Sequence, residues 1–199
     1  MVKAMRFMTF VSGENTFPGI VKEKAVVKLS SLLSLRSLGL SDSRDLLPFI
    51  EKVDPNTLRL LKEELQSISP KSLNDMLASG DAFPIEAVKV KAPLPRPPGV
   101  FCLGFNYRSH APELKRPIPE VPIIFMKPSK AVVGPEEQIV LPKAATRVDF
   151  EVELTVVMGK GGRSIPRSKA YDRIFGYTIL NDITARDIQQ RDFSLARPW

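Results

Sequence analysis

The chain has 199 residues, of which 43% are hydrophobic and 26% are charged, and its formal net charge at pH 7 is +7. These proportions are close to the averages for soluble globular proteins, so they exclude a disordered chain and a fibrous repeat, and the length allows one or two domains. Basic and acidic residues alternate along the chain, which indicates a solvated surface and argues against a nucleic-acid-binding face.

No stretch approaches the ~20 apolar residues needed to cross a bilayer, and the N-terminus lacks the apolar core and cleavage site of a signal peptide. A single cysteine, Cys102, excludes an intramolecular disulfide and is typical of a reducing compartment. We therefore expect a soluble cytoplasmic protein, with the mitochondrion as the alternative, and neither a membrane nor a nucleic acid as partner. Salt-sensitive binding would be the sign of a nucleic-acid partner.

Two short strands are expected near the N-terminus. The runs Met5 to Val11 and Ala25 to Leu29 are rich in residues that favour strands, and residues 13–15 between them form a turn region. This pattern predicts an N-terminal hairpin.

Helices are expected in the next segment. Ser43 is a candidate cap for a short helical segment that Pro48 would kink or end. Asn56 is a candidate cap for a helix from Thr57 to Ile68, because large aliphatic residues recur there at three- and four-residue spacing. A shorter helix is expected from Ser72 to Ala78, ending before the following glycine.

Segment 83–99 contains five prolines, four of them within its last seven residues. Proline breaks regular helix, so this segment is expected to be an extended linker. The sequence thus predicts three parts: an N-terminal domain at residues 1–82, a Pro-rich linker at 83–99 and a second domain at 100–199.

Short apolar runs separated by proline and glycine follow the linker, which is typical of a strand-rich domain. The expected strands are Val100 to Phe105, Pro122 to Lys127, Ala131 to Val133, Gln138 to Leu141, Val148 to Met158 and Ile174 to Leu180. Helices in the first part and strands in the second predict an α+β chain.

Strict alternation marks the segment from Arg147 to Met158. Its even-numbered positions are apolar, whereas Asp149, Glu151 and Glu153 occupy successive odd-numbered positions. Residues two apart in a strand share a face at about 6.6 Å, so these carboxylates line one side. The row is either the wet face of an antiparallel sheet or part of a site for a hard divalent cation.

A further acid, Asp182, follows the apolar run that ends at Leu180, and it shares the parity of that residue. A carboxylate there is costly to bury without a partner. An exposed strand end or a helix cap would explain it. Alternatively, Asp182 joins Glu151 and Glu153 in a three-carboxylate site.

The only histidine, His110, follows the expected strand at Val100 to Phe105. If Ser109 caps a short helix, His110 and Glu113 lie on one face and can hydrogen-bond. A histidine oriented by a carboxylate can serve as a general base near neutral pH, although a lone histidine is more often structural.

These motifs together, in their order and spacing, resemble the fumarylacetoacetate hydrolase family over about residues 100 to 199. The segments that carry the resemblance are Gly104 to Tyr107, His110 with Glu113, Pro122 to Pro128, Val148 to Leu154, Gly176 with Tyr177, Asn181 with Asp182, and Ala185 to Gln189.

The resemblance implies a mainly-β catalytic domain of the β-roll type, preceded by a small α+β N-terminal domain and assembled as a homodimer. It implies Mg²⁺ or Mn²⁺ held by Glu151, Glu153 and Asp182, and water activated by His110 with Glu113. Arg186 and Gln189 match family positions near the substrate.

The chemistry implied is hydrolysis or lysis of a C–C bond in an acylpyruvate or related 2-oxo acid, through an enolate that the metal stabilises. Decarboxylation of oxaloacetate and isomerisation or decarboxylation of a dienoic 2-oxo acid are the family's alternatives, and the sequence does not choose among them.

Family members continue beyond the segment matching Ala185 to Gln189 with a lysine-containing strand and the rest of the roll, whereas this sequence ends at Trp199. The resemblance therefore implies a catalytic domain that is incomplete at its C-terminus and an apolar face on Val148 to Met158 that is partly uncovered. An inactive truncated fragment, at most binding metal or associating with itself, is the alternative to an enzyme.

Overall fold

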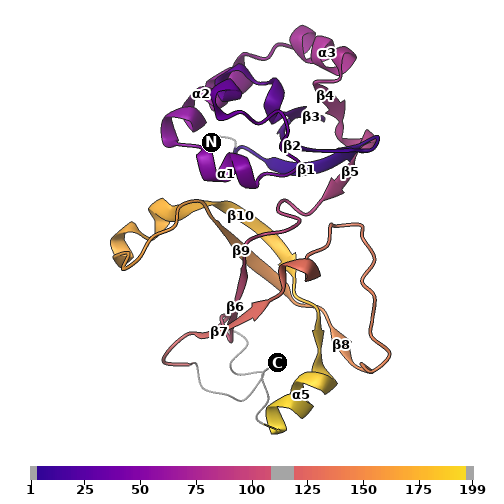
Figure 1. The fold of residues 1–199 in the computed structure, drawn as a ribbon, viewed down its shortest axis with the longest axis vertical. Coiled ribbons are helices and arrows are strands. Elements are labelled where there is room, and N and C mark those ends of the chain that lie inside the picture. Colours follow the sequence, from indigo (N-terminus) through magenta and orange to yellow (C-terminus); the bar gives the residue numbers. More distant parts are fainter. Residues whose placement is uncertain (1–3, 109–118, 196–199) are drawn as a thin grey trace. The chain divides into compact units, whose positions relative to one another are not determined.

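The computed structural model describes residues 4–108 and 119–195 (Figure 1). The chain divides into two compact units, residues 1–137 and 138–199, and each is described by itself below. Helices and antiparallel strands both occur, as an α+β chain requires. No helix in the described part of the chain combines the length and the apolarity needed to span a membrane.

The first unit contains a five-stranded antiparallel sheet with strand order β4-β3-β2-β1-β5. Its strands are β1 (Phe7–Ser12), β2 (Asn15–Lys22), β3 (Ala25–Lys28), β4 (Ala82–Pro84) and β5 (Lys89–Lys91).

The N-terminal hairpin differs from the expected one. Strand β1 pairs with β2, which the sequence pattern missed, and the expected second strand is β3, the third in the chain. Pro18 and Gly19 lie inside β2 and hide it, because both residues are depleted in strands. Gly19 is required there, because a Cβ would lie 2.5 Å from Val26 Cγ2 and 2.7 Å from Phe10 Cε1.

Two of the three helices begin earlier than expected, whereas the first begins later, at Leu47, so Ser43 does not cap it. The three helices are α1 (Leu47–Lys52), α2 (Pro55–Ser67) and α3 (Pro70–Ser79). Asp54, and not Asn56, caps α2 by accepting from the amides of Asn56 and Thr57 at 2.8 and 3.1 Å. Each helix has proline in its first turn, where the missing N–H costs nothing. Pro48 therefore starts α1, contrary to the expectation that it would end a helix.

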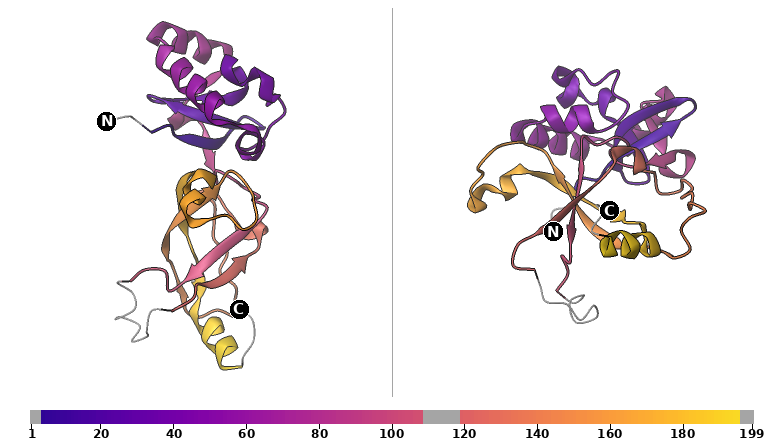
Figure 2. Two further views of the ribbon diagram at one scale, coloured as in Figure 1. Left: turned by 90° about the vertical axis from the view of Figure 1, so that its left-hand side faces the viewer. Right: turned by 60° about the horizontal axis from the view of Figure 1, so that its bottom comes forward.

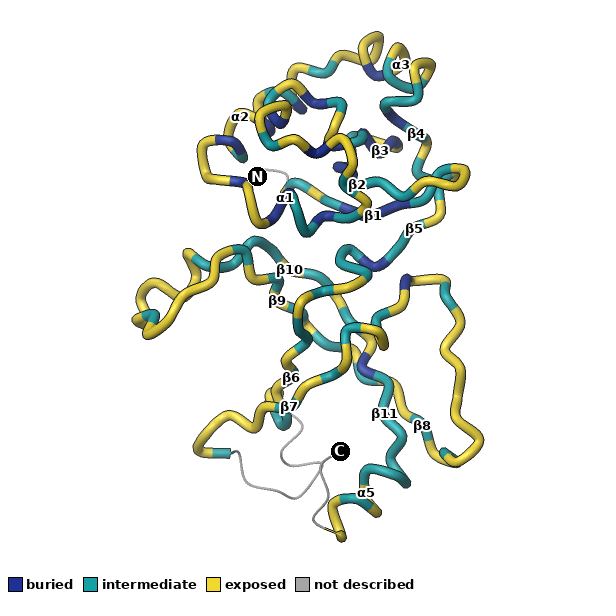
Figure 3. The backbone as a smooth tube through the Cα atoms, in the orientation of Figure 1, coloured by how far each residue is buried: buried dark blue, intermediate teal, exposed yellow. Residues whose placement is uncertain are grey.

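These helices lie together on one side of the five-stranded sheet (Figure 2). On this side Ile20 lies opposite Phe7, whose ring centroid is 5.2 Å from that of Phe49 in α1, and Ile20 is fully buried. Phe10 has the opposite parity on β1 and is fully buried on the other face, where its ring centroid lies 5.7 Å from that of Phe17 and 5.6 Å from that of Phe83. In the described residues, every hydrophobic side chain that is buried lies between Met8 and Ala92. Figure 3 shows this concentration of buried residues around the sheet and helices.

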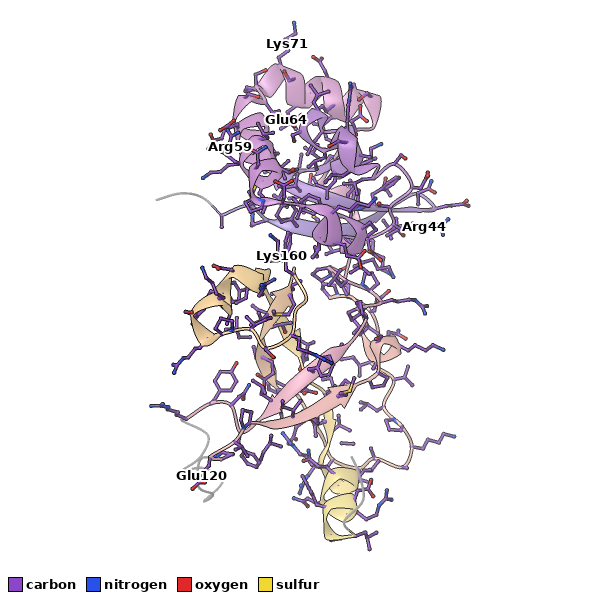
Figure 4. All side chains as sticks on the ribbon, turned by 60° about the vertical axis from the view of Figure 1, so that its left-hand side comes forward. Arg44, Arg59, Glu64, Lys71, Glu120 and Lys160 are labelled. Atoms are coloured by element: carbon purple, nitrogen blue, oxygen red, sulfur yellow. The ribbon has the colours of Figure 1, made fainter. Side chains whose placement is uncertain are left out.

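A carboxylate on α2 holds the connection that precedes the helices. Glu64 accepts hydrogen bonds from the amides of Leu33 and Ser34 at 2.7 and 2.9 Å, at the start of the 3-10 helix Leu33–Leu38. Figure 4 labels Glu64 and, one turn earlier, Arg59, which pairs with Glu63 at 2.7 Å. Glu64 thus satisfies main-chain donors that the short helix leaves without partners.

The Pro-rich segment 83–99 is not a linker throughout. Its first part contributes β4 and β5 to the sheet, so the extended connection is confined to residues 92–99. That connection is held by side chains, because the hydroxyl of Thr9 donates to the carbonyl of Pro93 at 2.7 Å and the hydroxyl of Ser129 to that of Pro97 at 2.6 Å. The expected domain boundaries themselves stay predictions.

Strands β6 (Val100–Gly104) and β7 (Ile123–Lys127) pair as an antiparallel ladder close to the expected positions. The expected strands at Ala131 to Val133 and Gln138 to Leu141 do not form; a 3-10 helix at Ser129–Ala131 and irregular chain stand there. Glu137 accepts from Lys91 and, at 2.6 Å, from the amide of Gly134, so this irregular segment is fixed by local polar contacts.

The second unit consists of two ladders and a helix. Strand β9 (Val152–Met158) pairs with β10 (Ile174–Asn181), and β8 (Val148–Asp149) pairs with β11 (Thr184–Ala185). Strand β11 leads directly into α5 (Arg186–Ser194), as Figure 1 shows. The expected strand from Val148 to Met158 is therefore interrupted at residues 150–151. The complete β-roll stays a prediction.

The apolar face of the β9–β10 ladder is exposed. Leu154 is 63% exposed and its cross-strand partner Ile179 is 77% exposed, and Val156 and Tyr177 form the next exposed pair. The side chains at the alternate positions of β9, which include Glu153, are more covered than this apolar face. The face that carries Glu153 is thus less exposed to solvent than the apolar face, so the acidic row is not simply the solvated face of the sheet. The expectation of an uncovered apolar face is confirmed.

Candidate active site

The pairing of β9 with β10 places the predicted carboxylates on one face. Glu153 lies opposite Leu180, and Val152 lies opposite Asn181. The next step of the same register sets Glu151 opposite Asp182, and the amide of Asp182 donates to the carbonyl of Glu151 at 2.7 Å. Because side chains alternate along strands, Glu151, Glu153 and Asp182 share one side.

Asp182 is the most buried of these acids, with 4% of its surface exposed. It is the one carboxylic acid classed as buried in residues 4–108 and 119–195. A charged carboxylate needs a polar or cationic neighbour in such a position, because desolvation disfavours its ionised form. Its burial therefore supports a role at the site over an exposed strand end.

Arg186, the first residue of α5, reaches into this group of acids. Its Nε donates to Asp149 Oδ2 at 2.9 Å, its Nη2 donates to Glu151 Oε1, and its Nη1 donates to Gln189 Oε1 at 3.1 Å. The guanidinium side chain is 25% exposed and that of Glu151 is 27% exposed. All three nitrogens of one planar cation thus donate a hydrogen bond, two of them to carboxylates and one to an amide oxygen.

The start of α5 is anchored to the chain before β8. Asp187 Oδ2 accepts from both the amide and the hydroxyl of Thr146, at 2.6 and 2.7 Å, and the amide of Arg186 donates to the carbonyl of Arg147 at 2.8 Å. The hydrogen bond from the Thr146 hydroxyl, followed by that from its amide, lowers the pKa of Asp187 to about 2. These contacts fix the position from which Arg186 projects.

Oxygen ligands are what Mg²⁺ and Mn²⁺ prefer, so Glu151, Glu153 and Asp182 fit such an ion in chemistry and in strand register. Their side chains do not yet converge: in the described residues, no three acidic, histidine or cysteine side chains are grouped closely enough to hold a metal ion. Glu151 instead faces the guanidinium of Arg186.

His110 and Glu113, the predicted general-base pair, lie outside the described residues. Arg186 and Gln189, predicted to lie near the substrate, contact each other, and Arg186 also contacts Asp149 and Glu151. Two participants were missed. Asp149 belongs to the acidic row of the sequence but received no role, and Asn181 Oδ1 accepts from the amide of Glu151 at 3.2 Å. The available signals were that Asp149 precedes Glu151 by two residues, as a same-face neighbour in a strand would, and that Asn181 is adjacent to Asp182 in the sequence.

Comparison with known families gives one match that covers half of the chain. The C-terminal domain model of fumarylacetoacetate hydrolase matches residues 99–199, which include every site residue described above.

Curated relatives match over a similar length. An uncharacterized protein of Methanocaldococcus jannaschii is 48% identical over 57% of this chain and 45% of its own length. The oxaloacetate tautomerase YisK of Bacillus subtilis is 44% identical over 61% of this chain and 41% of its own, and the human mitochondrial oxaloacetate tautomerase FAHD2A is 37% identical over 69% and 44%. The chain thus spans less than half the length of these relatives.

Solved structures resemble nearly the whole chain. The fumarylacetoacetate hydrolase of Exiguobacterium antarcticum aligns with a TM-score of 0.67 over 96% of this chain and 60% of that one, at 23% identity, which shows the fold alone. The 2-hydroxyhepta-2,4-diene-1,7-dioate isomerase of Mycobacterium marinum aligns with a TM-score of 0.63 at 25% identity, over 95% of this chain and 58% of that one.

Proposed function

Because the chain belongs to the fumarylacetoacetate hydrolase family, we propose that its site acts on a 2-oxo dicarboxylic acid and interconverts its keto and enol forms, with oxaloacetate as the first candidate. The sequence alone favoured cleavage of a C–C bond. Two curated relatives that match over 61% and 69% of this chain, at 44% and 37% identity, are named oxaloacetate tautomerases, and this moves tautomerisation to first place.

One structural observation carries the proposal: the guanidinium of Arg186 stands beside Glu151 and Asp149 at the start of α5, supported by Gln189. A guanidinium is a planar fork that binds carboxylates in two-point contacts. It is suited to hold one carboxylate of a dicarboxylic substrate, while the acidic face of β9 lies next to it.

Tautomerisation moves one proton from the carbon beside the keto group to the keto oxygen. In this proposal Arg186 binds and orients the substrate carboxylate, and Gln189 orients Arg186. His110 with Glu113, outside the described residues, moves the proton. Mg²⁺ or Mn²⁺ on Glu151, Glu153 and Asp182 remains part of the proposal, and when bound it would supply a Lewis acid for the keto oxygen.

The same site supports a second candidate, hydrolysis of acylpyruvates, because the matching domain model takes its name from a hydrolase. These two reactions and decarboxylation, the family's third, leave different products. Tautomerisation changes only the enol fraction of oxaloacetate, decarboxylation releases pyruvate and CO₂, and acylpyruvate hydrolysis releases pyruvate and a carboxylic acid.

The test follows these products for the 199-residue chain with Mg²⁺. We expect faster decay of the near-ultraviolet absorbance of enol-oxaloacetate, without pyruvate, and at least a ~10-fold loss in Gln189→Leu and Asp182→Asn. Arg59→Met, an exposed change on α2, is the matched control and should keep the rate. Pyruvate release would replace the proposal by decarboxylation or hydrolysis, and rates equal to buffer would overturn it.

A further inference from the structure

We infer that Arg186 is an internal cation that competes with a divalent metal ion for Glu151, so that metal binding releases one edge of the guanidinium to an anionic ligand. This inference rests on the proposed function for the identity of the metal site. It goes beyond that function by assigning Arg186 a role in the metal-free protein.

The contact with Glu151 is the first step. Nη2 of Arg186 donates to Oε1 of Glu151, and this oxygen belongs to one of the three carboxylates that fit a divalent ion. Two cations cannot both use the same lone pairs at contact distance without strong repulsion, because the Coulomb energy grows as the distance falls and the surroundings are partly desolvated. An ion that takes Oε1 of Glu151 must therefore displace Nη2.

The remaining contacts of Arg186 make that displacement feasible. Its Nε keeps Asp149 at 2.9 Å, its Nη1 keeps Gln189 at 3.1 Å, and its amide stays on the carbonyl of Arg147 at 2.8 Å. The guanidinium can leave Glu151 while these three anchors hold its other edge and its backbone. Asp149 thus acts as a second counter-ion that retains the charge of Arg186 inside the site.

A consequence for ligand binding follows directly. While Nη2 is bound to Glu151, three of the five N–H donors of the guanidinium are engaged, and an incoming carboxylate that uses the donor facing Glu151 must displace that side chain. After the ion has taken Glu151, Nη2 is free to donate. By linkage, metal and an anionic ligand then favour each other's binding by the same factor. The metal should bind before the 2-oxo acid.

Mn²⁺ affinity, measured by calorimetry and by the loss of the free-ion signal in electron paramagnetic resonance, tests the competition without turnover. Arg186→Gln should bind Mn²⁺ more tightly than the parent, by roughly 5- to 150-fold, the usual range of coupling between sites. Arg191→Gln is the matched control, because Arg191 carries the same charge on the same helix but pairs with Asp192 at 3.1 Å, away from Glu151. It should leave the affinity within about twofold.

A double-mutant cycle separates competition from a general change of charge. Asp149→Asn should weaken Mn²⁺ binding in the parent, because Arg186 then depends on Glu151 alone, and the loss should be smaller when Arg186 is already Gln. Equal losses in both backgrounds, or an Arg186→Gln variant that binds Mn²⁺ no better than the parent, would overturn the inference.

Thermal unfolding and turnover of oxaloacetate are measured separately from Mn²⁺ affinity. Mn²⁺ should raise the midpoint of thermal unfolding more in Arg186→Gln than in the parent, since tighter binding stabilises the native state more. A variant that is unfolded without metal and is rescued by Mn²⁺ also supports the competition, whereas one that Mn²⁺ leaves unfolded refutes it. If competition holds but oxaloacetate is not turned over, the proposed reaction fails while the role of Arg186 stands.

Discussion

The amide nitrogen of Asp182 lies 2.7 Å from the carbonyl oxygen of Glu151 and donates a hydrogen bond to it. This bond continues the antiparallel register of β9 and β10 one step beyond their ends. Two acids far apart in the sequence thereby meet on one face, and Glu151 also pairs with Arg186. The main chain, and not the side chains, fixes the distance between them.

Asp182→Asn should weaken Mn²⁺ binding by more than the ~10- to 100-fold that is typical of removing a group that merely supports a ligand. The side chain is almost isosteric, so the fold should persist, and removal of a buried charge should leave the thermal midpoint unchanged or higher. Calorimetry and thermal unfolding measure the two effects. Asp172→Asn, an acid whose side chain is 64% exposed, is the control, and equal affinities in both variants would exclude Asp182 as a ligand.

The pair of hydrogen bonds from Thr146 to Asp187, called the Thr146–Asp187 clamp below, predicts that the stability of this unit falls in acid. Hydrogen bonds from Thr146 lower the pKa of Asp187 from 3.8 to about 2, so its contribution to stability is complete above pH 3.8 and is lost as the pH falls toward 2. Thr146→Val should move the pKa of Asp187 back upward, because the hydroxyl is the main cause of the shift. Nuclear magnetic resonance titration of the Asp187 carboxyl measures it, and an unchanged pKa would contradict the clamp.

Gly19→Ala should destabilise the N-terminal sheet by about 1–3 kcal/mol, the usual effect of overpacking a core. A Cβ at Gly19 would lie 2.5 Å from Val26 Cγ2, and the neighbouring Phe10 ring leaves no room to shift. Urea unfolding, followed by circular dichroism, gives the change in free energy. Gly161→Ala is the control because nothing lies within 4 Å of that position, and equal stabilities of the two variants would refute the packing argument.

The exposed face of the β9–β10 ladder should drive association, which agrees with the homodimer implied by the family resemblance. Leu154→Lys combined with Ile179→Lys places charge on both sides of this face and should shift the chain toward the monomer and reduce binding of a hydrophobic dye. Light scattering after size exclusion measures the mass. Leu33→Lys, which removes an apolar side chain that is 62% exposed elsewhere, should leave the mass unchanged. If the double variant associates as the parent does, another surface is responsible.

Alternation and periodicity predicted the elements that have a strong local signal. The acidic row of Glu151 and Glu153 followed from a period-two pattern and the strand Ile174 to Leu180 from a short apolar run, and the structure pairs Glu153 with Leu180 in one ladder. Strand β2 was missed because Pro18 and Gly19 conceal it, and its stability comes from pairing on both edges. Local propensity cannot report such pairing.

The site was predictable in its acids but not in its contacts. Parity put Asp182 on the same face as Glu153, whereas only the folded chain shows that Arg186 engages Asp149 and Glu151. That contact joins the start of a helix to two strand ends, and no sequence period relates these positions. Asp54 was overlooked as the cap of α2 because the helix was expected to begin after Asn56, whereas it begins at Pro55.

The concentration of the apolar core between Met8 and Ala92 has a consequence for biosynthesis. A nascent chain can complete this core while the acidic strands are still inside the ribosome, because none of its buried apolar partners comes from the later residues that the structure describes. The first half would then fold outside the ribosomal exit tunnel before the exposed ladder that follows it emerges.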